Sequence, residues 1–251
     1  MATYGNVKMH KRFPTAEFLS HLPISGTLKD ESTKYYIFRV AETNDDSNVE
    51  EGYTKEELEI KNTEEYQKFV EKSTITLKGR PNLLNHLTSL LDKVIEDGDT
   101  YPHEHEMGVD GFKSYFLSGE AFVLFNEHTD FWVDTIENWN ENVMGLFYVK
   151  PNYPGRCSHV CNGGFITAPR YRSMGVGLEM GKAYLVVAPL IGYVCSLFNL
   201  VFVTNGPSLT LWKKLGFHQI GTLPKAGRLK GYPPNEYVDA AIFYYDFQKS
   251  Q

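Results

Sequence analysis

The sequence lacks several features that mark specialised protein classes. It has only three cysteines in 251 residues, too few for the disulfide framework of a small secreted domain, so a reducing compartment is expected. Lysine and arginine (25) are fewer than aspartate and glutamate (31), and the net charge of −6 argues against a protein that mainly neutralises nucleic-acid phosphates. The longest apolar run is broken by Pro189, Gly192 and Asn199, so it falls short of the roughly 20 residues of a membrane span. We therefore expect a protein that binds neither nucleic acid nor membrane.

The N-terminus also lacks the apolar stretch of a secretory signal. It is basic and free of acids until Glu17, which leaves an organellar presequence open. A cytoplasmic location is expected, with a mitochondrial or nuclear pool as the alternatives. The length of 251 residues suffices for one large domain with a sizeable core.

Hydrophobic patterning predicts an α/β fold. Residues 81–98 show leucines at three- and four-residue spacing and end at a glycine, which is typical of a helix. Strand, helix, strand, helix and strand then alternate over the last hundred or so residues, which implies at least one parallel pair of strands. The predicted strands cover 35–40, 73–77, 121–125, 143–149, 163–167, 197–204 and 240–247, and further helices cover 111–117, 177–187 and 208–215.

The first third of the chain differs from the rest. Residues 42–71 are rich in acids and show little apolar periodicity, which is typical of a surface insertion or an exposed helix. We predict an N-terminal extension with strands and this acidic insertion over 1–78, followed by the main domain over 79–251.

A glycine turn carries the first functional signal. The predicted strand that ends at Thr167 leads into Arg172-x-x-Gly175-x-Gly177 and then into a helix. The first N–H groups of a helix lack internal partners, and glycines let an anion approach the backbone, so this pattern favours a phosphate site. An ordinary strand-to-helix turn remains the alternative. The pattern is neither a Walker loop nor the dinucleotide fingerprint.

A second motif follows about thirty residues later, Asn205-x-x-Ser208-x-x-x-Trp212-x-x-x-Gly216-Phe217. Together the two motifs resemble the GNAT acetyltransferases. The resemblance implies the GNAT-type α+β fold, a mixed and partly parallel central sheet with helices on both faces, and acetyl-CoA as cosubstrate. It places cofactor-binding residues at Ile166, Thr167, Arg172, Ser173, Met174, Gly175, Val176, Gly177, Asn205, Ser208 and Trp212.

The chain departs from that family pattern at two positions. Ser208 replaces the usual alanine, which is a mild change. Trp212 replaces the tyrosine that often protonates the departing thiolate, and an indole cannot act as a general acid near neutral pH.

A narrower resemblance covers about 100–247. The segment from Phe147 to Phe165, with its R-C-S-H-x-C-N-x-G-F sequence, is similar to fungal N-acetyltransferases that act on L-azetidine-2-carboxylate and related proline analogues. This resemblance implies a small cyclic imino acid as the amine acceptor, with Phe165 packed on its ring and Asn162 and Asn199 on its carboxylate or nitrogen. It also implies that Asn205 orients the acceptor or the pantetheine amide.

The chemistry of acetyl transfer constrains the catalytic roles. An asparagine cannot take a proton at neutral pH, so a water chain that ends at Asp239 or His159 is our hypothesis for the base. The predicted catalytic set is Asn199, Asn205 and Asp239, of which the two asparagines would align the reactants.

Other polar and aromatic residues have less specific interpretations. Alternation along a strand would bring Cys157, His159 and Cys161 to one face, but a structural zinc site takes four ligands, and we expect no metal. The segment 103–106, with its two histidines and two glutamates, is interpreted as a solvated turn. Trp132 and Trp139 are interpreted as loop anchors.

Two competing functions stay open on the sequence. The same chemistry could act on another amine, such as a polyamine, an aminoglycoside or a protein. A binding module for acetyl-CoA without turnover is the other alternative, supported by Trp212. A homodimer is an expectation that rests on the resemblance alone.

Overall fold

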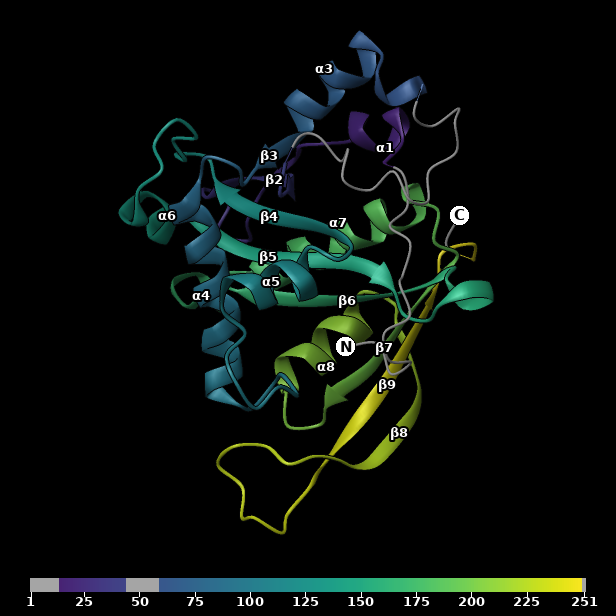
Figure 1. Ribbon diagram of the computed structural model, residues 1–251. Helices are drawn as coiled ribbons and strands as arrows, with labels where there is room; N and C mark the ends of the chain where they lie inside the picture. The colour runs from purple at the N-terminus through teal and green to yellow at the C-terminus, as the bar shows by residue number, and fades with distance from the viewer. Residues whose placement is uncertain (1–13, 44–58, 250–251) are drawn as a thin grey trace.

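The computed structural model describes residues 14–43 and 59–249. Its strands form one mixed sheet in the order β1-β2-β4-β5-β6-β7-β9-β8, with β3 beside β2 (Figure 1). The strands are β1 (Ile24–Thr27), β2 (Lys34–Ala41), β3 (Thr74–Thr76), β4 (Glu120–Asn126), β5 (Val143–Pro151), β6 (Val160–Thr167), β7 (Cys195–Phe202), β8 (His218–Gly227) and β9 (Val238–Asp246). The helices are α1 (Ala16–Ser20), α3 (Glu64–Ser73), α4 (Pro81–Asp97), α5 (Gly108–Phe116), α6 (Ile136–Asn142), α7 (Val176–Leu190) and α8 (Gly206–Lys214).

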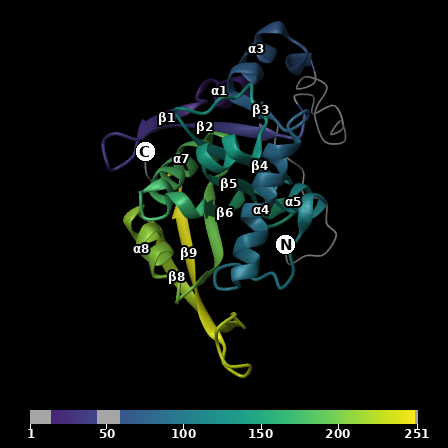
Figure 2. The same ribbon diagram turned by 90° about the vertical axis from the view of Figure 1, so that its left-hand side faces the viewer.

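The helices cover both faces of the sheet, as predicted. Figure 2 shows α4 and α5 on one side of the sheet and α7 and α8 on the other. Helix α4 begins at Pro81 and ends before Gly98, whose φ of 69° is the left-handed conformation that terminates many helices. Four of its five leucines are buried in the main core, and Leu84 packs against that core partly buried. The helix predicted from the leucine spacing is therefore confirmed.

The sheet opens between β6 and β7. These two strands run parallel, which confirms the predicted parallel pair, but they pair only at Val160–Cys195 and Cys161–Ser196. Beyond those residues β6 stays paired with β5, and β7 stays paired with β9. The facing edges of β6 and β7 therefore diverge toward the carboxyl end of β6.

A buried polar network fixes the point where the two strands separate. The Tyr184 hydroxyl on α7 lies 3.1 Å from Cys161 Sγ and 2.7 Å from Ser196 Oγ. All three residues are buried, and burial raises the pKa of the Cys161 thiol to about 12. The network ties α7 to the last paired residues of both strands, so the position of the opening is set by neutral hydrogen bonds.

The N-terminal residues join the same sheet. β2 pairs with β4 in antiparallel register, and the main hydrophobic core extends from Phe18 to Phe247. The division into 1–78 and 79–251 stays a prediction. Residues 44–58 of the acid-rich stretch lie outside the described residues, and α3 confirms a helix at its end.

Other elements differ from the predictions. The sequence did not predict β1 and β8, and the polar loop predicted after β4 contains the short helix α6. Trp139 on α6 is fully buried and donates from Nε1 to Asp134, whereas Trp132 is 95% exposed and anchors nothing. The interpretation as a loop anchor was therefore wrong for Trp132. None of the described helices is long and apolar enough to cross a membrane.

Candidate active site

Where β6 and β7 are no longer paired, their facing edges border an opening in the sheet, which we call the cleft. The glycine turn connects β6 to α7 beyond the carboxyl end of β6. After Thr167 the chain makes a short 3-10 turn and reaches Gly175, whose φ of 97° immediately precedes the first residue of α7. Ser173 also has a positive φ, 64°. Gly177, in contrast, has no left-handed conformation, so of the two glycines in the turn only Gly175 uses the positive φ that glycine permits.

The turn presents free backbone donors. In the described part of the chain, no protein acceptor takes the N–H groups of residues 173–177, whereas Arg172 N donates to Pro169 O and Leu178 N donates to Gly175 O. The positive end of the α7 dipole adds to these free donors, so the turn is suited to an anion. The Arg172 side chain is 54% exposed, with Nη2 4.0 Å from Asp97 Oδ2.

Helix α8 lies beside this turn. A Cβ on Gly177 would lie 3.8 Å from Thr167 Oγ1 and 3.7 Å from the Leu211 side chain. Asn205 caps α8, because its Oδ1 accepts from Ser208 N at 3.2 Å. The two predicted cofactor residues Asn205 and Ser208 therefore form the start of a helix next to the glycine turn.

Aromatic side chains form a wall on the α7 and α8 side of the cleft. The ring of Phe165 is 4.8 Å from Trp212 and 5.5 Å from Phe147, on which it stacks. Trp212 also lies 4.6 Å from Phe198 and is 4% exposed. The residue that stands in place of a tyrosine acid is thus a packing residue of this wall, while Phe165 stays partly exposed.

Asparagines lie on the opposite face of the sheet. Alternation along β6 directs Phe165 toward α7 and Asn162 toward α4 and α5. On β7, the Asn199 amide exchanges two hydrogen bonds with the Asn152 amide, at 3.0 and 2.5 Å. The structure therefore places Asn199 in a reciprocal amide pair that the sequence did not reveal.

Two connections border this face of the cleft. The α4–α5 connection carries Tyr101, whose hydroxyl would be 2.8 Å from a Cβ on Gly164, so this tyrosine lies directly over β6. The β8–β9 connection contacts the α4–α5 connection, through Lys230 N to Gly98 O at 2.9 Å and an ion pair between Arg228 and Glu104 at 2.6 Å. In Figure 1 the β8–β9 connection extends well beyond the sheet.

His103 corrects the predicted solvated turn. Its ring packs against Tyr115 at 4.9 Å, and its Nδ1 is buried without a protein partner among the described residues. Burial lowers the pKa of His103 below its ordinary value. The interpretation of a solvated turn holds for the exposed Glu104 and His105 and was wrong for His103, because aromatic neighbours cover it.

The proposed base residues lie apart from the asparagines. Asp239 is on β9, and its Oδ1 accepts from Lys225 N at 2.7 Å. His159 is exposed just before β6. No described side-chain hydrogen bond joins either residue to Asn162, Asn199 or Asn205.

The cysteines do not line up on one strand as supposed. Cys157 ends a 3-10 turn and is exposed, whereas Cys161 is buried in β6. The alternation argument was therefore wrong for Cys157. Within 14–43 and 59–249, no group of three or more His, Cys, Asp or Glu is placed to hold a metal ion.

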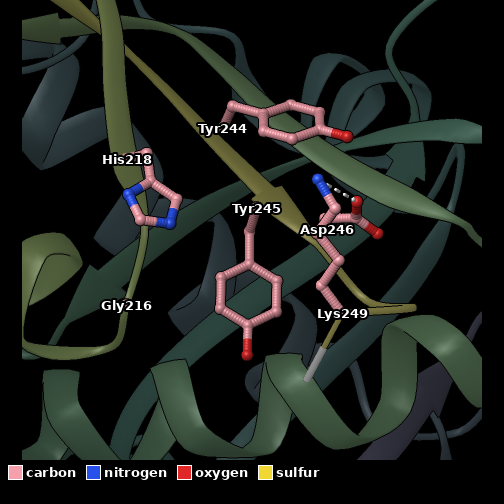
Figure 3. Close-up of a pocket in the computed structure, with 6 residues that line it drawn as sticks. All are labelled: Gly216, His218, Tyr244, Tyr245, Asp246 and Lys249. Carbon is pink, nitrogen blue, oxygen red and sulfur yellow. Dashed lines mark ion pairs between the residues drawn. The ribbon is translucent and has the colours of Figure 1, made fainter. Parts of the chain in front are cut away.

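A surface cavity of about 250 Å³ lies away from all these residues. It is lined by Gly216, His218, Tyr244, Tyr245, Asp246 and Lys249, which Figure 3 shows around the ends of β8 and β9. Asp246 and Lys249 form an ion pair at 3.7 Å across it. None of the predicted site residues lines this cavity, so the cleft between β6 and β7 is the candidate active site.

Sequence reasoning assigned no role to several residues of the cleft: Tyr101, His103, Tyr148, Lys150 and Asn152. Tyr148, Lys150 and Asn152 lie within the 147–165 segment that carries the fungal resemblance, and Tyr101 lies within a shorter segment, 100–102, that shares it, so the resemblance was the available signal for these four residues. The roles of Tyr148 and Lys150 depend on which face of β5 they occupy, and a resemblance does not show this.

Comparison with known proteins agrees with this geometry. The model of the acetyltransferase (GNAT) family matches residues 91–217, from α4 to the end of α8. The N-acetyltransferase aca1 of Schizosaccharomyces pombe is 42% identical over 184 residues, which cover 71% of this chain and 86% of that protein.

Solved structures share the fold. A GCN5-related N-acetyltransferase from Kribbella flavida superposes with a TM-score of 0.55 at 24% identity, covering 65% of this chain and 91% of that one. A phosphinothricin acetyltransferase from Sinorhizobium meliloti, solved in complex with acetyl-CoA, gives a TM-score of 0.53 at 15% identity, covering 65% and 83%. At these identities the likeness establishes the mixed α/β fold.

Proposed function

The chain belongs to the acetyltransferase (GNAT) family, and from that premise we propose that it acetylates the nitrogen of a small cyclic imino acid such as L-azetidine-2-carboxylate or another proline analogue. Membership of the family makes it an N-acetyltransferase, with acetyl-CoA as the cosubstrate. The preference for a cyclic imino acid is the finer part of the proposal. It is supported by the polar and aromatic residues that border the cleft.

One observation carries the assignment of the cofactor half. The backbone N–H groups of residues 173–177 have no protein acceptor in the described chain and lie at the start of α7. A diphosphate supplies several acceptor oxygens, so these groups fit the phosphates of coenzyme A. The proposed cofactor residues are Ile166, Thr167, Arg172, Ser173, Met174, Gly175, Val176, Gly177, Asn205, Ser208 and Trp212.

The opening between β6 and β7 supports the acceptor half. The thioester of acetyl-CoA supplies an activated acetyl group, and the chain has to align an amine with it. Asn162 and Asn199 contribute amides on the α4 and α5 side of the two strands that border the opening, and Phe165 contributes a partly exposed ring from the opposite face of β6. Alignment of two bound reactants can supply on the order of 7–11 kcal/mol of the barrier in favourable cases.

Acetyl transfer also requires an acceptor for the amine proton. Asn199 and Asn205 cannot take the amine proton, so their catalytic role is alignment. We assign the base to a water chain that ends at Asp239 or His159. A general base is worth roughly 10²–10⁴ in rate. Asp239→Asn and His159→Ala should together remove the acidic limb of the pH–rate profile, and an unchanged profile in both variants would exclude both residues.

A thiol-release assay tests the proposed function. Purified protein, acetyl-CoA and a panel of L-azetidine-2-carboxylate, proline analogues, polyamines, aminoglycosides and peptides would be compared by kcat/KM. We expect the cyclic imino acids to give the highest values. Faster turnover with a polyamine or peptide would contradict the proposed acceptor, and no turnover with any amine would contradict the catalytic assignment. The homodimer and the cytoplasmic location stay predictions of the sequence.

A further inference from the structure

Lys150 is a lysine enclosed by aromatic side chains on the acceptor side of the cleft. Its Nζ donates to Tyr115 O at 2.9 Å and lies 3.9 and 4.3 Å from the ring centroids of Tyr115 and Tyr148. Among the described residues, no carboxylate lies within 4.0 Å of this ammonium group. An ammonium group carries three N–H donors, so at least one remains for a ligand.

Register places this lysine beside the predicted acceptor residues. Lys150 on β5 is directly opposite Asn162 on β6. Both side chains project toward α4 and α5, because Phe147 and Phe165 on the same two strands stack on the other face. The lysine therefore shares the face that carries Asn162, on the side of the sheet away from the aromatic wall.

Two further polar atoms on this face have no protein partner. Tyr101 Oη and His103 Nδ1 are both buried and unpaired among the described residues. Their rings lie 6.2 Å apart, and His103 packs on the same Tyr115 ring that Lys150 covers. A buried polar atom without a partner is unfavourable, so these two atoms point to a ligand that forms hydrogen bonds. The Tyr101 hydroxyl can donate to such a ligand, and His103 Nδ1 donates in the tautomer that carries its proton on Nδ1.

Resting on the proposed acetyltransferase function, we propose that Lys150, with Asn162, Tyr101 and His103, forms an anion subsite that binds the carboxylate of the acceptor. The set offers one positive charge and neutral donors, which suits a single carboxylate. The phosphates of the cosubstrate are accounted for by the turn before α7, on the other side of the sheet. Lys150 thus becomes the residue that makes the enzyme select amines that bear a carboxylate.

The protonation states of the surrounding groups make the proposal testable by pH. Burial raises the pKa values of Tyr101, Tyr115 and Tyr148 and lowers that of His103, so all four side chains stay neutral from pH 7 to 9. Burial also lowers the pKa of Lys150 to about 8. The positive charge on Lys150 is therefore present below pH 8 and is lost above it.

A binding experiment can use probes that resemble the acceptor but carry no amine. Cyclobutanecarboxylate and cyclobutanecarboxamide have the same ring and do not titrate between pH 7 and 9. By calorimetry we expect the wild-type protein to bind the carboxylate at least tenfold more tightly at pH 7, because charge-assisted hydrogen bonds are the stronger ones. This advantage should decline as the pH rises from 7 to 9. Equal affinity for the two probes at pH 7 would overturn the proposal.

Variants assign the effect to Lys150. Lys150→Met should abolish the preference for the carboxylate, and Lys150→Arg should keep part of it. Lys68→Met is a matched control, because Lys68 is an exposed lysine on α3 that pairs with Glu64. A preference that persists in Lys150→Met would overturn the proposal. If Lys150→Met does not fold, the pH titration of the wild-type protein decides.

Kinetics separate this proposal from the proposed function. With L-azetidine-2-carboxylate and its carboxamide as acceptors, Lys150→Met should lower the ratio of the two kcat/KM values roughly tenfold to a hundredfold. The KM for acetyl-CoA should change less than threefold. An unchanged ratio would overturn the role of Lys150. If the wild-type protein acetylates neither acceptor, the proposed function fails, whereas the calorimetric comparison still decides whether the subsite exists.

Discussion

The glycine turn before α7 and the polar residues facing α4 and α5 border the same cleft, yet they are built from different chemical groups. The turn uses backbone N–H groups of one short segment, residues 173–177. The proposed acceptor side consists of side chains from β5, β6, β7 and the α4–α5 connection. A cosubstrate that many enzymes share can be held by backbone geometry alone. Selection of one acceptor requires side chains, and these can change without altering the turn.

The largest effect is expected at the aromatic wall, because its side chains come from both strands that border the cleft, β6 and β7. Trp212→Ala should lower the free energy of unfolding by roughly 3–5 kcal/mol, because Trp212 is buried against Phe165 and Phe198. Urea denaturation measures this change. Trp132→Ala is the control, since Trp132 is 95% exposed and its loss should leave the midpoint unaltered. Equal urea midpoints for Trp212→Ala and Trp132→Ala would show that the packing of Trp212 does not stabilise the fold.

The next largest effect should be confined to the cofactor half. Gly175→Val places a β-branched residue at a φ of 97°, which costs at least about 1–2 kcal/mol and disturbs the turn. We expect the KM for acetyl-CoA to rise about tenfold or more, with a smaller change in acceptor KM. Gly177→Ala should have less effect, because a Cβ there meets only ordinary contacts at 3.7 and 3.8 Å. A larger rise in the KM for acetyl-CoA in Gly177→Ala than in Gly175→Val would contradict the conformations assigned to the two glycines.

A smaller effect should be confined to the acceptor half. Asn199→Ala should raise the acceptor KM about fivefold to tenfold, the value of one net hydrogen bond, and leave the KM for acetyl-CoA unaltered. Asn152→Ala should raise the acceptor KM by a similar factor, because the Asn152 and Asn199 amides are joined by two hydrogen bonds. The double variant should be no worse than either single variant. Equal damage to cofactor binding in Asn199→Ala would instead indicate a purely structural amide.

The smallest effect is expected from the exposed arginine of the turn. Arg172→Ala should raise the KM for acetyl-CoA about twofold to threefold at low salt and less at high salt, because an exposed charge is screened. Arg170→Ala is the matched control, since Arg170 is a neighbouring exposed arginine 4.0 Å from Glu141. An effect independent of salt would show that Arg172 acts through the fold of the turn.

The comparison of the two halves also explains what the sequence could predict. The strand before the turn, the helix after it and Gly175 were visible because local spacing records backbone geometry. The Asn152–Asn199 pair joins residues 47 positions apart in sequence, and Lys150 meets Tyr115 across 35. Such contacts depend on sheet register, which no local pattern records. β8 was missed for a related reason, because this edge strand is mostly exposed and lacks a buried apolar face.

Amide hydrogen exchange tests most directly whether the turn before α7 holds the cosubstrate. The exchange rates of the backbone amides of residues 173–177 would be measured with acetyl-CoA and with acetyl-pantetheine, which carries the same thioester without the diphosphate. We predict that acetyl-CoA protects these amides and that acetyl-pantetheine leaves them as fast as in the free protein. Unaltered exchange at saturating acetyl-CoA would contradict the assignment of the turn as the phosphate site.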